Sequence, residues 1–121
     1  MKPHIVILLS VVFLLTLMQA PHCDAQTCAY VANSEDGSLS VIDTADHAVI
    51  KTIPDIGASP HGVAMSPLGD YVFVANPGSH AVSVIQTSDN SIRHAIPGNS
   101  LEPQAVAVSA DGKVLYVTAS G

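Results

Sequence analysis

The stretch GVAMSPLGDYVFVAN, residues 62–76, combines a short apolar run, a tight turn and a second apolar run. A similar stretch, AVAVSADGKVLYVTA, occupies residues 105–119, and part of the second run also occurs earlier as CAYVAN at residues 28–33. Apolar runs of this length on either side of a Gly-containing turn are typical of β-hairpins. The sequence therefore predicts a repeated hairpin as the basic unit of the fold.

One fixed spacing relates the copies over the whole chain that follows residue 25. Val31, Val74 and Val117 lie 43 residues apart, and an aromatic residue precedes each of them. The triplet SVI at residues 40–42 returns at residues 83–85 without any insertion. Self-similarity with a period near 40 residues indicates a repeat architecture, and four-stranded propeller blades have this period.

Each repeat holds four apolar runs of strand length, which we designate positions A to D in chain order. In the complete repeat they are residues 62–66, 71–76, 81–87 and 91–97. Position A has small residues, B and C are almost continuously apolar, and D carries Arg93 and His94. Continuous apolar runs indicate burial on both faces of a sheet. Such a wedge-shaped sheet is typical of a β-propeller blade, with A near the axis and D at the rim.

We therefore predict an all-β fold, a β-propeller with blades of four antiparallel strands. After residues 1–25, the predicted repeat region is residues 26–121. It holds a partial blade at residues 28–55, a complete blade at 62–97 and a partial blade at 104–120. About two blades are present, whereas a closed propeller needs about four to eight. We expect a piece of a longer propeller, or a chain that completes a ring by self-association. A helix bundle is excluded because no later stretch keeps a 3.6-residue apolar period.

Three glycines are predicted to be structural turn residues. Gly69 and Gly112 lie in the A–B turns, where a short hairpin needs the positive φ that glycine adopts without strain. Gly78 follows Pro77, and this pair is typical of a type II turn with glycine at its second central position. Asp46 and Asp89 recur after position C, where side-chain to backbone hydrogen bonds explain them.

The first 25 residues are typical of a secretory signal peptide. Lys2 precedes an uncharged apolar run at residues 5–18, and small residues surround a predicted cut after Ala25. The run is short for a membrane span, which needs about 20 residues, so we expect cleavage and no stable span; an uncleaved anchor is the alternative. Cleavage leaves one cysteine, Cys28. It is either a small buried residue or a thiol whose partner lies outside this sequence.

The repeats resemble the YVTN family of β-propeller repeats. The resemblance rests on YVAN at residues 30–33, FVAN at 73–76 and YVTA at 116–119, and it extends through SVIDT at 40–44 and PHGVAMSPLGD at 60–70. It implies a bacterial or archaeal protein that is secreted, periplasmic or on the cell surface. It also implies a propeller that acts as a binding or surface-layer module, and it implies no active site.

The net charge of −6 comes from scattered acidic residues, and only four residues are basic. Without a basic stripe, nucleic acid is a poor candidate partner. We expect a protein or cell-surface partner, or self-association. No motif of a hydrolase, metalloprotease, phosphate-binding loop or calcium loop follows residue 25. We therefore predict no catalytic residues, no metal site and no cofactor.

One pair of polar residues is a weak candidate for ligand binding. His61 opens position A on the side that faces the predicted central channel, and Gln104 occupies the same place one repeat later. A structural role is the competing interpretation, because one histidine without nearby ligands makes a poor metal site.

Two functions are therefore in competition. The first is an exported, non-enzymatic module for surface interaction or ligand binding. The second is a fragment of a propeller enzyme, either a lactonase-like hydrolase or a quinoprotein- or nitrite-reductase-like oxidoreductase. Short turns favour the first, because enzyme pockets usually need longer loops.

Overall fold

The computed structural model describes residues 27–121, and within them it contains nine β-strands, one short 3₁₀ turn and no α-helix. The strands are β1 (Cys28–Asn33), β2 (Ser38–Asp43), β3 (Ala48–Ile53), β4 (Val63–Met65), β5 (Tyr71–Asn76), β6 (Ala81–Gln86), β7 (Ser91–Pro97), β8 (Glu102–Val108) and β9 (Leu115–Ser120). The predicted all-β fold class is confirmed.

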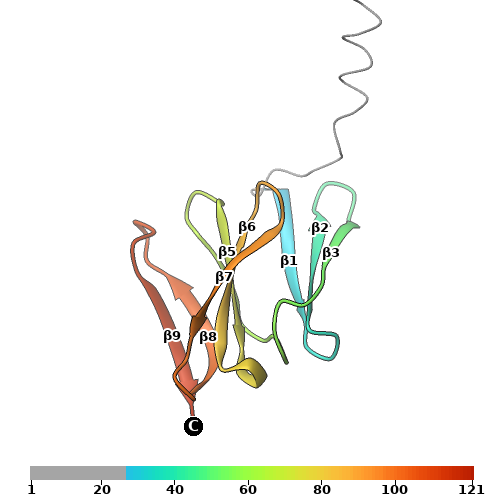
Figure 1. Cartoon of the computed structure of the whole chain (residues 1–121). Helices are drawn as coiled ribbons and strands as arrows, with labels where there is room; N and C mark the ends of the chain where they lie inside the picture. The colour runs from blue at the N-terminus through green and yellow to red at the C-terminus, as the bar shows by residue number, and fades with distance from the viewer. Residues whose placement is uncertain (1–26) are drawn as a thin grey trace, which may run out of the picture.

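The strands form three separate antiparallel sheets in chain order (Figure 1). The N-terminal sheet has the order β1-β2-β3, the central sheet β4-β5-β6-β7, and the C-terminal hairpin β8-β9. The central sheet lies between the other two (Figure 1). Within each sheet, every strand therefore pairs only with the strand directly before or after it in the chain. Such local pairing needs only short turns, which the Gly-, Pro- and Asp-containing segments supply.

The repeat extends to the irregularities of the backbone. In the central sheet Val84 pairs with His94 and Ile85 with Ile92, so Arg93 is an extra, bulged residue. In the N-terminal sheet the same shift leaves out Ile50, which lies 43 residues earlier. A bulge increases the local twist and is frequent at sheet edges. Its recurrence at the outermost strand bends both sheets in the same way.

The main core lies between the N-terminal and central sheets. Its fully buried members are apolar and come from both sheets and from the linker between them: Leu39, Val41, Ile53, Ile56, Val72, Val74 and Ile85. Tyr30 packs against this cluster, and partial burial raises the pKa of its hydroxyl. The almost continuously apolar runs at positions B and C are explained by burial on both faces, because Ile85 lies in this core whereas Val82 and Val84 of the same strand are buried outside it.

The innermost strands of neighbouring sheets approach each other closely at Gly62. A Cβ atom added there would lie 2.6 Å from the carbonyl oxygen of Gln104 and 2.8 Å from the Cα of Ala105. Only a residue without a side chain allows this approach of the backbones. β8 is longer than β4 because its pairing with β9 continues past a shift at Gln104 as far as Glu102 and Ser120.

Two of the three predicted turn glycines have a positive φ, 78° at Gly69 and 72° at Gly112. In each turn the glycine amide donates to the carbonyl oxygen of a serine three residues earlier, Ser66 or Ser109. The side chain of the same serine accepts a hydrogen bond from the residue that follows the turn.

The predicted type II turn at Gly78 is wrong. Residues Pro77–Ser79 form a 3₁₀ turn, and the left-handed residue is His80, with φ of 51°. Gly78 has another role, because a Cβ atom there would lie 2.9 Å from that of Ala58, and its amide donates to the Ala58 carbonyl oxygen. The glycine is therefore needed for the close approach of the inter-sheet linker, a contact that local sequence does not reveal.

Cys28, on β1, is disulfide-bonded and only half-buried, which differs from the small buried residue that was one of the two expectations for it. The predicted signal peptide and its cleavage position lie outside the described residues and stay predictions. Within residues 27–121, no helix has the length and apolar character of a membrane span.

Candidate functional site

The linkers between sheets and the B–C turns lie at the same end of the molecule. Because neighbouring strands run antiparallel, positions B and D end where positions A and C begin. We call this the linker end, and it contains the segments 34–37, 54–62, 77–80 and 98–101. His61 and Gln104, the two predicted ligand-binding residues, both lie at this end.

The structure places His61 and Gln104 at equivalent positions beside the closely packed innermost strands. His61 is exposed, and its amide donates to the Ala75 carbonyl oxygen at 2.9 Å. The side-chain amide of Gln104 makes long contacts of 3.5 Å to the Glu102 carbonyl oxygen and 3.4 Å to the Ser120 hydroxyl. Their backbones are neighbours through Gly62. No convergence of the two side chains on a common point follows from these contacts, so ligand binding there stays a prediction.

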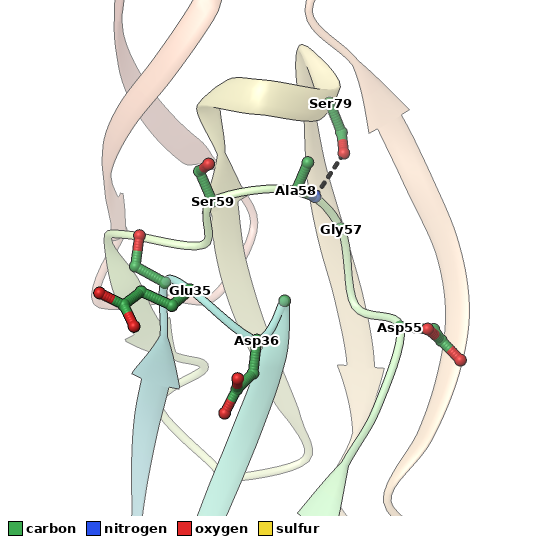
Figure 2. Close-up of a pocket in the computed structure, with 9 residues that line it drawn as sticks. Glu35, Asp36, Asp55, Gly57, Ala58, Ser59 and Ser79 are labelled. Carbon is green, nitrogen blue, oxygen red and sulfur yellow. Dashed lines mark hydrogen bonds between the residues drawn. The ribbon is translucent and has the colours of Figure 1, made fainter.

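A shallow hollow of about 510 Å³ opens at the linker end (Figure 2). The residues that line it are small or acidic: Ser34, Glu35, Asp36, Gly37, Asp55, Gly57, Ala58, Ser59 and Ser79. None of these lining residues is basic. The Ser79 hydroxyl accepts a hydrogen bond of 2.6 Å from the Ala58 amide (Figure 2), which holds the linker against the B–C turn of the central sheet.

The three carboxylates of this hollow do not form a metal site. In Figure 2 the side chains of Glu35, Asp36 and Asp55 point in different directions. Among residues 27–121 no group of three or more His, Cys, Asp or Glu side chains could hold a metal ion. Metal coordination and acid–base catalysis both need carboxylates that converge. The hollow is therefore an open acidic surface, and no catalytic geometry is present in it.

A buried polar network fixes the linker beneath this hollow. Asn76, at the end of β5, donates to the Ser83 hydroxyl at 2.9 Å and to the Val74 carbonyl oxygen at 3.1 Å. The Ser83 hydroxyl in turn donates to the carbonyl oxygen of Ile56 in the linker. Because buried polar groups are costly without partners, this chain of bonds favours a single position of the linker.

A second depression, mainly apolar, lies between the central sheet and the C-terminal hairpin. It consists of two adjoining pockets of about 390 and 190 Å³ that share Ile96. Together they are lined by strands β5, β6, β7, β8 and β9 and by the linker: Tyr71, Phe73, Val82, Val84, Arg93, His94, Ile96, Pro97, Gly98, Leu101, Pro103, Val117 and Ala119. We call this depression the β7–β9 hollow. Mainly apolar, it differs from the acidic hollow at the linker end.

Two carboxyl groups of the described chain have a pKa that is lowered by local turn contacts. The hydroxyl and the amide of Ser91 donate to Asp89 and lower the pKa of its carboxyl, and the nearby Arg93 guanidinium adds to the effect. The Ser109 hydroxyl and the Lys113 amide likewise lower the pKa of Asp111. Both carboxylates are fully exposed, and their bonds explain them as turn residues.

Neither hollow was predicted from the sequence. A signal for the acidic hollow was present, because two polar segments, SEDG at 34–37 and PDIGASP at 54–60, both flank ends of neighbouring strands. The signal for the β7–β9 hollow was the 43-residue spacing itself. This spacing relates Ile96 to the buried Ile53 and Val117 to the buried Val74, and the two later residues are exposed.

No protein-family model matches the chain, and no curated protein is similar to it in sequence. Solved structures do match. Hydrazine synthase from Kuenenia stuttgartiensis superposes with a TM-score of 0.72 and 25% identity, over 78% of this chain and 26% of that chain. A functionally unknown protein from Desulfotomaculum acetoxidans gives a TM-score of 0.67 and 20% identity, over 78% of this chain and 32% of that chain.

The dihydro-heme d1 dehydrogenase NirN, in complex with DHE, gives a TM-score of 0.67 and 23% identity. The match covers 80% of this chain and 20% of that chain. This chain therefore spans between a fifth and a third of the length of the solved structures it resembles. The likeness shows the fold: the described residues have an all-β, propeller-like architecture that resembles part of these larger proteins.

Proposed function

We propose that this chain is a section of an exported β-propeller of the YVTN type and that it acts as a non-enzymatic binding module. The YVAN, FVAN and YVTA strands support the family, and the apolar segment at residues 5–18 supports export to the periplasm, the cell surface or the medium. A protein or cell-surface partner is the proposed ligand class, and no cofactor is proposed.

One observation carries this proposal: on the face of the central sheet that is turned away from the N-terminal sheet, the outer residue Ile96 is open, although Val82 and Val84 on the same face are buried. Ile53 on the N-terminal sheet is 4% exposed, whereas Ile96, its counterpart 43 residues later, is 39% exposed. Large apolar residues that line an open depression are typical of interaction surfaces. Binding is favoured over catalysis because the acidic side chains at the linker end diverge (Figure 2) and the turns are short.

The second candidate function is a section of a propeller enzyme, and the comparisons favour keeping it. Two of the similar structures are named as enzymes, a hydrazine synthase and a dihydro-heme d1 dehydrogenase. An oxidoreductase of the quinoprotein or nitrite-reductase type would suit such relatives, and a lactonase-like hydrolase is the other enzymatic form. In either case further blades would have to supply the catalytic groups.

Light scattering on the purified chain, over a range of concentrations, tests whether the exposed apolar residues of the blades cause the chain to associate. We expect concentration-dependent association, and a dilute monomer that unfolds cooperatively and never associates would contradict it. The gene sequence beyond Gly121 separates the two candidate functions. Further repeats with short turns favour the binding module, whereas long polar insertions or a haem-attachment motif favour the enzyme.

A further inference from the structure

We draw no further inference here: the strongest candidate, the acidic hollow at the linker end that Glu35, Asp36 and Asp55 line, rests on a cluster of carboxylates that point in different directions (Figure 2), and nothing else among residues 27–121 points to a ligand there.

Discussion

The two interfaces of the central sheet use equivalent residues and differ in how well they are buried. On the side of the N-terminal sheet, Val74 has no exposed surface, whereas its counterpart Val117 on β9 is 41% exposed. The backbone around the two residues is the same. Val74 is the fourth residue of β5 and Val117 the third residue of β9, and both strands occupy position B beside a position-A strand. The difference therefore comes from the neighbouring strands and not from the repeat sequence itself.

This comparison separates what a repeat encodes from what its neighbours supply. The strand pairs, the bulges and the turn serines recur with the 43-residue spacing. Burial recurs for Val82 and Val84, the counterparts of Leu39 and Val41, but not for Ile96 and Val117, the counterparts of Ile53 and Val74. In repeat proteins much of the stability comes from the contacts between adjacent units. The C-terminal hairpin should accordingly be the least stable part of the described fold.

The largest expected effect comes from truncating the core of the well-packed interface. Ile85→Ala removes a fully buried side chain and should lower the free energy of unfolding by about 2–5 kcal/mol. Since small domains have a total stability of about 5–15 kcal/mol, this variant should be close to unfolding. Urea denaturation followed by circular dichroism measures the loss, and a loss below about 1 kcal/mol would contradict the assignment of this core.

The matched pair Ile53→Ala and Ile96→Ala compares the two interfaces directly. We expect about 3 kcal/mol for Ile53, which is buried, and about 1 kcal/mol for Ile96, which keeps part of its surface in solvent. The same denaturation experiment serves both variants. Equal losses would mean that the two interfaces are equally well packed.

A substitution at Gly62 should act on the junction of the innermost strands. Gly62→Ala would place a methyl group against the backbone of Gln104 and Ala105, and backbone atoms cannot move aside as a flexible side chain can. We expect a loss of about 1–3 kcal/mol and increased amide exchange in β8. Gly112→Ala, in an exposed turn with φ of 72°, is the control and should cost about 1 kcal/mol without a change in β4.

The Asn76 network should contribute more than its copy in the N-terminal sheet. Asn76→Ala removes the buried bonds to Ser83 and Val74 and should cost about 1–3 kcal/mol. Asn33→Ala removes partly exposed bonds to Ser38 and Ser40 and should cost about 1 kcal/mol or less. The test is a pair of thermal unfolding curves, and the reverse order of the two losses would show that the linker is fixed by other contacts.

The smallest effect concerns the titration of an exposed turn. The Ser91 hydroxyl is the main cause of the lowered pKa of Asp89, so Ser91→Ala should bring this pKa back toward its ordinary value of 3.8. A folded-state pKa below the unfolded one gives stability that is present above pH 3.8 and is lost as the pH falls through the lowered pKa. Carboxyl chemical shifts in an NMR titration follow the change, and an unchanged midpoint would contradict the cause.

Local patterns predicted the strands well because they depend on neighbouring residues. The alternation of apolar runs with Gly- and Asp-containing turns indicated the sheets, and Gly69 and Gly112 were identified by their own turn geometry. Gly78 was not, because its requirement arises from Ala58 in a distant linker. His80 takes the left-handed conformation there, which local preference would give to glycine.

The candidate sites were harder to predict, because they depend on contacts between sheets. The spacing placed His61 and Gln104 at equivalent positions, but spacing alone does not determine whether two side chains converge. The acidic hollow combines a turn of one sheet with a linker to the next, so its members are about 20 residues apart. The β7–β9 hollow depends on which residues of the central sheet the next sheet leaves uncovered, and the pattern within a single strand does not indicate this.

The most direct test of the difference between the interfaces is to extend the chain by one C–D hairpin. Gly121 is the counterpart of Gly78, so a copy of residues 79–97 would be appended after Gly121, and hydrogen exchange of the Val117 amide would be measured with and without it. The extension should slow the exchange of Val117 to the level of Val74 and raise the temperature of unfolding. Unchanged exchange at Val117, with the appended residues unfolded, would contradict the account that a position-C strand beside β9 is what protects Val117 from solvent.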